Sequence, residues 1–228
     1  MLKKLLIGIV LVVAVFLVYA SRRPDSYHVE RSAKIDAPPL VVFNQLDDFK
    51  AWSNWSPWEK IDPSMTRSYD GPPRGVGARY AWQGNKKVGK GKMEITESQP
   101  PTLVKERLEF IEPFAAVAET TFRVAPEGDK AATVTWSMDG RHNFVGKVFS
   151  VFMNMDKTIG PDFDRGLANL AQVSMAEAKK QEQALAEARA RAEADAKAKA
   201  EAQAAADAQA AAATKHKAKG GKGRRKPR

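Results

Sequence analysis

Hydrophobic residues recur at helical spacing between Phe144 and Val173. The large apolar side chains follow one another at steps of mostly three and four residues, which is the spacing of one face of an α-helix. They are Phe144, Val148, Phe149, Phe152, Met155, Ile159, Phe163, Leu167, Leu170 and Val173. Gly160-Pro161 interrupts the run, and proline clashes with the preceding turn, so we expect a kink or a restart there. The pattern predicts a long amphipathic helix whose apolar side needs a sheet to cover it.

The region before this helix instead alternates between apolar and polar residues. A first strand is predicted over Tyr27–Ile35, and further strands over 65–141 are separated by glycine and proline turns, as in an antiparallel meander. Alternation assigns these residues to the inner face: Tyr80, Trp82, Met93, Ile95, Leu108, Phe110, Phe122, Val124, Val134, Trp136 and Met138. We therefore predict an α+β fold, with a curved antiparallel sheet of about seven strands around the long C-terminal helix.

Two short helices are expected between the first strand and the meander. In Asp36-Ala37-Pro38-Pro39 the aspartate is a candidate N-cap, and prolines suit a first helical turn. Further on, Trp52, Trp55 and Trp58 are spaced three residues apart, which places them on one side of a short helix or turn. This cluster has two interpretations, a plug of the core or the aromatic wall of a ligand cavity.

Leu5–Ala20 is an uninterrupted apolar run preceded by Lys3 and Lys4. As a helix it spans roughly 24 Å, and Leu2 can extend it while the lysines reach the membrane interface. A signal peptide cleaved after Ala20 is the alternative. We favour a membrane anchor because the run stays bulky to its end. The prediction is a single-pass membrane protein with a cytoplasmic N-terminus and the domain on the outer, periplasmic side.

The composition changes after Val173 to Ala, Glu, Lys, Arg and Gln. We predict a solvent-exposed helix over 175–213, without the large apolar residues of a stable coiled coil, and a disordered basic tail over 214–228. Residues 1–23 are then the anchor or signal segment and residues 24–174 the folded domain. The tail holds eight basic residues and no acidic one, so it carries most of the net charge of +10.

The basic tail has three interpretations. It could adhere to anionic lipid headgroups or an anionic polymer, it could contact nucleic-acid phosphates, or it could only add solubility. Nucleic acid is not expected as a partner, because that reading needs the tail in the cytoplasm and the tail has no aromatic residue for base stacking.

The predicted order of elements resembles the START-like (SRPBCC) helix-grip fold. The motifs that carry the resemblance are Ile35-Asp36-Ala37-Pro38 followed by Val42-Phe43 and Leu46, the Trp52–Trp58 cluster, Gly75-Val76-Gly77-Ala78, and Gly166-Leu167-Ala168-Asn169-Leu170. Together they are similar to the polyketide cyclase/dehydrase branch over residues 26–173. The resemblance implies an apolar cavity between sheet and helix for lipids, hormones or polyketide-like ligands, with no common catalytic set.

The predicted cavity residues combine the inner strand positions with the tryptophan cluster and the long helix. They are Trp55, Trp58, Tyr80, Trp82, Met93, Glu106, Leu108, Phe110, Phe122, Trp136, Met138, Phe149, Met153 and Phe163. Glu106 is the carboxylate of the set, and desolvation should raise its pKa, so that it could act as a general acid/base or anchor a ligand hydroxyl. A register error and a structural pair with Arg141 are the alternatives. Asp139, Arg141 and His142 are expected at the cavity mouth.

Other chemistry finds little support in the sequence. Without cysteine there are no disulfides or thiolate sites, and His28, His142 and His216 lack partners at metal-ligand spacing. Neither a nucleophile elbow nor a phosphate-binding loop is present, and we expect no cofactor or metal. Three hypotheses follow: non-catalytic binding of a hydrophobic small molecule or lipid, a cyclase-like enzyme using Glu106, and an interaction protein acting through the basic tail. We favour the first, because the inner face carries no dense group of polar residues.

Overall fold

The computed structural model describes the backbone of residues 2–220 and the side chains of residues 2–210. The helical elements are α1 (Leu2–Ser21), α2 (Pro39–Leu46), α3 (Trp52–Trp55), the 3₁₀ turn η1 (Pro57–Lys60), α4 (Phe144–Ser150) and α5 (Met155–Gly220). The strands are β1 (Ser26–Ile35), β2 (Thr66–Asp70), β3 (Arg79–Gln83), β4 (Lys90–Gln99), β5 (Leu103–Glu112), β6 (Ala116–Pro126) and β7 (Ala132–Arg141).

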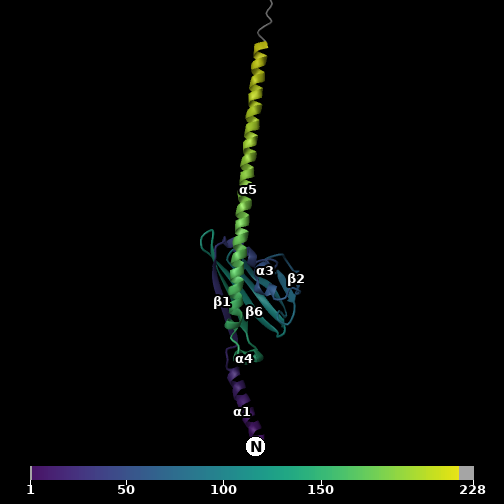
Figure 1. Ribbon diagram of the computed structural model, residues 1–228, viewed down its shortest axis with the longest axis vertical. Coiled ribbons are helices and arrows are strands. Elements are labelled where there is room, and N and C mark those ends of the chain that lie inside the picture. The colour runs from purple at the N-terminus through teal and green to yellow at the C-terminus, as the bar shows by residue number, and fades with distance from the viewer. Residues whose placement is uncertain (1, 221–228) are drawn as a thin grey trace, which may run out of the picture. The chain divides into compact units, whose positions relative to one another are not determined.

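The strands form one antiparallel sheet in the order β1-β7-β6-β5-β4-β3-β2 (Figure 1). Strands β2 to β7 follow one another as a meander, and β1 pairs with the last of them from Ser26↔Arg141 to Ile35↔Ala132. The α+β architecture predicted from the alternation, and the helix-grip fold that the family resemblance implies, are confirmed.

The first part of α5 packs on the inner face of this sheet. Phe163, Leu167 and Leu170 are buried against the strands, at the three- and four-residue spacing of one helix face. The amide of Asn169 donates to the carbonyl oxygen of Trp55 at 3.0 Å, which ties α5 to α3. At the rim, Arg31 on β1 pairs with Asp156 at 2.7 Å. The core therefore lies between the sheet on one side and α2, α3 and α5 on the other.

The long helix begins later than the apolar spacing predicts. α4 ends at Ser150 and α5 starts at Met155, so the predicted helix from Phe144 is two helices. Each start has an asparagine cap: the Asn143 side chain accepts from the Gly146 N–H at 2.8 Å, and the Asn154 side chain accepts from the Lys157 N–H at 3.2 Å. These two caps explain a break that apolar periodicity alone does not reveal.

Two expectations about helix starts do not hold. α5 continues through Pro161, so the restart that was one of the two alternatives there does not occur. Pro161 and Lys157 are exposed to solvent, and the Lys157 carbonyl oxygen lacks the N–H partner that residue 161 would otherwise supply. The predicted Asp36 cap does not form either, because α2 begins two residues later than expected. Pro38 occupies its N-cap, with no side-chain hydrogen bond.

α1 is apolar from Leu5 to Ala20, after Lys3 and Lys4, and buries only Ala20. An 18-residue window of this helix has a mean hydropathy of 2.5, and no other described helix is long and apolar enough to cross a membrane. These properties fit a membrane span and a signal segment alike.

A second unit begins at Lys179. Residues 179–210 are helical and exposed, with surface pairs such as Arg191 with Glu187 at 3.8 Å. α5 extends to Gly220, so residues 214–220, predicted to be disordered, are helical in their backbone. Residues 221–228 lie outside the described residues, and their disorder stays a prediction.

Candidate functional site

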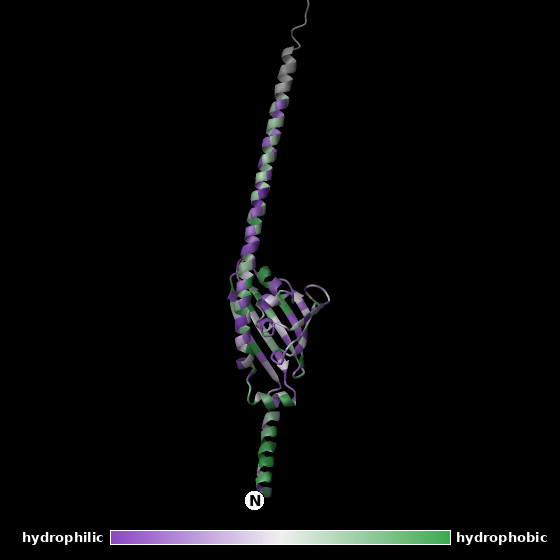
Figure 2. Ribbon diagram, turned by 45° about the vertical axis from the view of Figure 1, so that its right-hand side comes forward, coloured by the Kyte–Doolittle hydropathy of each residue, from purple (hydrophilic) through white to green (hydrophobic). Residues whose placement is uncertain are grey.

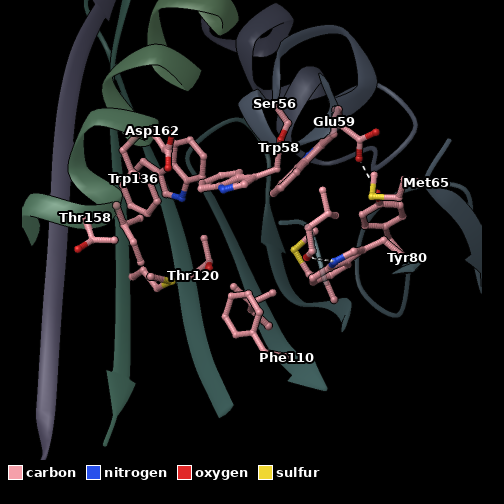
Figure 3. A pocket seen from close by; sticks show the side chains of 18 residues that line it. Ser56, Trp58, Glu59, Met65, Tyr80, Phe110, Thr120, Trp136, Thr158 and Asp162 are labelled. Atoms are coloured by element: carbon pink, nitrogen blue, oxygen red, sulfur yellow. Dashed lines mark hydrogen bonds between the residues drawn. The ribbon is translucent and has the colours of Figure 1, made fainter. Parts of the chain in front are cut away.

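A cavity of about 310 Å³ lies between the sheet, the η1 turn and the first turns of α5 (Figure 3). Aromatic and aliphatic side chains from four strands and three helical segments line it. The lining residues are Trp52, Ser56, Trp58, Glu59, Met65, Tyr80, Trp82, Val88, Met93, Leu108, Phe110, Thr120, Trp136, Met138, Thr158, Ile159, Asp162 and Phe163. Its volume is at the lower end of the range of small-molecule sites.

The floor of the cavity is set by strand register. Tyr80, Met93 and Leu108 form one row across β3, β4 and β5. In the next row Trp82 and Phe110 lie on either side of Gly91, and a Cβ at Gly91 would be only 2.4 Å from the Trp82 ring. The missing side chain lets the Trp82 indole extend over β4 and meet the Phe110 ring edge-on, with centroids 6.2 Å apart.

The opposite wall is a set of contacting aromatic rings. Trp136 on β7 contacts Trp58 on η1 edge-on at 5.7 Å and stacks on Phe163 of α5 at 4.0 Å between centroids. Edge-on and stacked ring contacts of this kind hold a wall rigid, so the cavity is bounded by side chains with little rotamer freedom.

The Glu59 carboxylate at the cavity has hydrogen-bond partners for both of its oxygen atoms within the protein. The Tyr80 hydroxyl donates to Glu59 at 2.5 Å, and the other carboxylate oxygen of Glu59 accepts from Arg67 at 2.6 Å. Figure 3 shows the Glu59 and Tyr80 side chains beside each other at one end of the cavity. Burial and then the Glu59 carboxylate raise the pKa of Tyr80, so this phenol keeps its proton.

A second polar group of the cavity is not satisfied. The indole nitrogen of Trp136 is buried and has no hydrogen-bond partner among the described residues. By contrast, the indole N–H groups of Trp52, Trp55 and Trp82 donate to the carbonyl oxygens of Leu46, Gln45 and Val88, at 3.1, 3.1 and 3.2 Å respectively. A buried N–H without an acceptor is uncommon, and in a cavity wall it can be completed by a bound molecule.

Glu106 lies on the inner face of β5, as the alternation predicts, but it does not line the cavity. It is completely buried and level with Ile95 and Thr120 on the neighbouring strands, in the part of the sheet that contacts α2. Neither carboxyl oxygen has a partner in the described structure. Burial, with the nearby charge of Asp47 as a smaller cause, raises the pKa of Glu106 well above its ordinary value. Burial therefore favours the uncharged carboxylic acid form of this side chain.

Nine of the fourteen residues predicted from the sequence line the cavity. They are Trp58, Tyr80, Trp82, Met93, Leu108, Phe110, Trp136, Met138 and Phe163. Trp55 and Phe122 belong to the packed core behind it, which is the first of the two interpretations of the tryptophan cluster. Phe149 and Met153 lie away from it and are half exposed, because the chain breaks between α4 and α5.

The remaining polar predictions also fall outside the lining. Asp139 bonds His28 at 2.8 Å on the exposed face, and the His142 ring lies against Tyr27. Arg141 is exposed at the end of β7. The polar lining residues that the sequence did not predict are Ser56, Glu59, Thr120, Thr158 and Asp162. Of these, Thr120 carried a signal, since it occupies an inner position of β6 two residues before Phe122. Residues 2–210 contain no group of His, Cys, Asp or Glu that could hold a metal ion.

The sequence profile described as polyketide cyclase/dehydrase and lipid transport matches residues 26–174 of the chain. The chain belongs to this family. The match spans the whole sheet and the part of α5 that packs on it, and it excludes α1 and residues 175–228. A comparison with curated proteins found no match.

Solved structures of the same fold include norcoclaurine synthase from Thalictrum flavum in complex with dopamine and hydroxybenzaldehyde. It is 12% identical with a TM-score of 0.50, and the match covers 66% of this chain and 87% of that one. Protein Mll3558 from Rhizobium loti is 15% identical with a TM-score of 0.50, covering 64% and 96%. The Zhui aromatase/cyclase from Streptomyces sp. R1128 is 11% identical with a TM-score of 0.48, covering 66% and 94%. At these identities the likeness concerns the fold alone.

Proposed function

We propose that the domain binds a hydrophobic small molecule or a lipid-derived molecule that carries a hydrogen-bond acceptor. The observation that carries the proposal is the unpartnered indole N–H of Trp136 in the wall of an apolar cavity. The aromatic and aliphatic lining favours an apolar body, and the free N–H favours a carbonyl, ester or ether oxygen on it.

The arrangement supports binding better than catalysis. The Glu59 carboxylate is already held by Tyr80 and Arg67, and the raised pKa of Tyr80 makes that phenol a poor acid. Glu106, the acid/base of the cyclase hypothesis, is not among the residues that line the cavity. The third hypothesis, an anionic partner of the basic tail, concerns residues whose side chains lie outside the described part and stays a separate prediction.

The binding experiment can use the isolated domain, residues 24–178. Every residue of the hydrophobic core, and every apolar residue packed against it, lies between Tyr27 and Ala178, so removing α1 and the second unit removes none of it. The domain purified from its host is examined by native mass spectrometry with extraction of any bound lipid. It is then titrated with two fluorescent probes that share an apolar body, a naphthyl ketone and naphthalene.

The proposal expects the ketone to bind about fivefold to tenfold more tightly than naphthalene, because one buried hydrogen bond contributes about 1 kcal/mol. Trp136→Phe should abolish this preference. Trp82→Phe is the matched control, since that indole N–H is already bonded to Val88 and its loss changes cavity shape without freeing or removing an available donor. A domain that takes up neither probe and carries no co-purified molecule would refute ligand binding.

A further inference from the structure

A group of exposed apolar side chains lies at the end of the domain that carries α4. We call it the α4 patch. It comprises Ile111, Phe114, Val117, Phe144, Val145, Phe149, Phe152 and Met153. Phe152 is 76% exposed and Phe114 69% exposed, and the Phe114 and Phe149 rings are 6.1 Å apart, which joins the β5–β6 turn to α4. Large exposed apolar side chains gathered in this way usually mark an interaction site.

α1 makes direct contact with this patch. The Phe16 ring of α1 stacks on Phe152 at 5.7 Å between centroids, and α1 and α4 pack side by side. Two basic side chains fix the junction: Arg23 donates to the Ser150 carbonyl oxygen at 3.2 Å, and Lys147 donates to the Ser21 carbonyl oxygen at 3.5 Å. In Figure 2 the α4 segment is coloured hydrophobic and continues the apolar colour of α1 towards the sheet. The patch stays exposed although α1 already covers part of it.

The Phe16–Phe152 contact indicates how deep Phe152 would lie in a bilayer that α1 spans. Phe16 lies five residues before the end of α1 at Ser21, which is about 7–8 Å along a helix axis. If α1 lies in a bilayer, the Phe152 ring beside Phe16 lies at a similar depth below the end of α1. Interfacial helices bury their apolar faces by about 5–10 Å, so the position of Phe152 suits the boundary between headgroups and acyl chains.

The charges around the patch suit the same environment. The segment 141–155 contains Arg141 and Lys147 and no acidic residue, and Arg22 and Arg23 follow α1 directly. Asp25 and Glu112 are the acidic residues closest in sequence to the junction and to Phe114. Basic side chains beside an apolar surface reach anionic headgroups while the apolar residues enter the interface, and each contributes roughly 1 kcal/mol near an anionic membrane.

We propose that the α4 patch rests on a lipid bilayer, so that the domain is seated on the membrane surface through α4 and the β5–β6 turn as well as attached through α1. This inference is independent of the cavity ligand. It also has a consequence for the cavity: Phe110 precedes Ile111 in β5, and Thr158 lies in the first turn of α5, so this end of the cavity is next to the patch. With the patch on the bilayer, this end of the cavity would lie close to the lipids and to the apolar molecules dissolved in them.

Site-directed spin labelling of the full chain tests the proposal, because the chain has no native cysteine. Single cysteines replace Phe114, Phe149 and Phe152, and the labelled chains are reconstituted into vesicles of phosphatidylcholine with phosphatidylglycerol. Collision rates with oxygen, which concentrates in lipid, and with a water-soluble nickel chelate report the surroundings of each label. Val12→Cys in α1 is the lipid reference, and Val76→Cys, 59% exposed between β2 and β3, is the aqueous reference.

Seating predicts a severalfold lower nickel collision rate at the three patch labels than at Val76, with oxygen rates approaching that of Val12. The label at Phe114→Cys is also measured in two variant chains. With Phe149→Glu/Phe152→Glu its nickel collision rate should rise to the aqueous value, whereas with Val76→Glu, the control, it should stay low. Nickel rates at the patch equal to the Val76 reference would overturn the proposal. So would spin–spin broadening that disappears on dilution with unlabelled chain, since that outcome identifies a second copy as the occupant.

Discussion

The indole ring of Trp136 on β7 lies parallel to the phenyl ring of Phe163 on α5, at an interplanar angle of 7°. This stack joins the sheet to the helix and forms one wall of the cavity. The same indole ring leaves no room for a side chain at Gly166 of α5. A Cβ added there would be 2.6 Å from the Trp136 ring and 3.3 Å from Pro57. The cavity wall and the close approach of α5 to the sheet are therefore one packing arrangement.

Gly166→Ala should destabilise the isolated domain by about 1–3 kcal/mol, because the added methyl group overpacks this contact. Helix propensity alone predicts the opposite sign, a stabilisation of up to about 1 kcal/mol. Urea denaturation measures the change in the free energy of unfolding. The penalty should shrink in a Trp136→Phe background, since the clashing atom belongs to the indole six-membered ring. A stabilised Gly166→Ala domain would show that α5 does not approach β7 this closely.

Glu106→Gln should stabilise the domain increasingly as the pH rises above about 4.5, the ordinary pKa of this group. Folding raises the pKa of Glu106, so above that pH the native state holds a proton that the unfolded chain releases. The wild-type domain then loses stability at up to about 1.4 kcal/mol per pH unit until the native carboxyl ionises. The neutral amide has no such loss, and below the ordinary pKa the two proteins should differ little.

The measurement is the difference in the free energy of unfolding between wild type and Glu106→Gln across a pH series. Taking a difference removes the groups that titrate in both proteins, including Asp62 and Glu97, whose pKa values are lowered by hydrogen bonds and ion pairing. Glu109→Gln, at a partly exposed glutamate of the same strand, is the matched control. A difference that stays constant with pH would mean that folding does not shift the pKa of Glu106.

Tyr80→Phe should cost about 1.5–3 kcal/mol of stability, because the hydroxyl donates to a buried carboxylate. The phenyl ring keeps its stacking against Tyr69 at 5.4 Å and Trp82 at 5.8 Å, so the loss reports the hydrogen bond rather than the packing. Tyr69→Phe is a suitable control, because Tyr69 is more exposed and stacks on the same ring. Equal effects of the two substitutions in urea denaturation would contradict the assigned hydrogen bond.

The sheet and its inner face could be predicted from the sequence because alternation is a local property of the chain. Tyr80, Trp82 and Phe110 were assigned to the inner face in this way, and the structure places them along the cavity. The separation of α4 from α5 could not be predicted from periodicity, because the apolar steps continue through 151–154 while the asparagine caps decide where each helix begins. Phe149 and Met153 were therefore placed in the cavity when they belong to the exposed patch.

Glu106 shows a different limit of sequence analysis. Its face follows from alternation, but whether an inner-face residue meets the cavity or the packed core depends on which helix covers it. That is decided by the position of α2 over β5 and β6, which no local pattern encodes. The Glu59–Arg67 pair was missed for a similar reason, since it joins the η1 turn to β2 through side chains whose types are common on any surface.

Leu108→Trp distinguishes a true cavity from a packed core. Leu108 is partly buried and faces the cavity from β5. If the space of about 310 Å³ is empty in the free protein, the larger ring can enter it, and the free energy of unfolding should stay within about 1 kcal/mol of wild type. Binding of the naphthyl ketone should fall by at least tenfold, because the new side chain takes the space of the ligand.

Val104→Trp is the matched control, at a fully buried position of the same strand outside the lining. Its free energy of unfolding should fall by more than about 1–3 kcal/mol, because the larger side chain overpacks the core. Urea denaturation and probe titration of both variants provide the comparison. Equal destabilisation by the two substitutions would mean that side chains fill the space beside Leu108, and the ligand-binding proposal would then lose its structural basis.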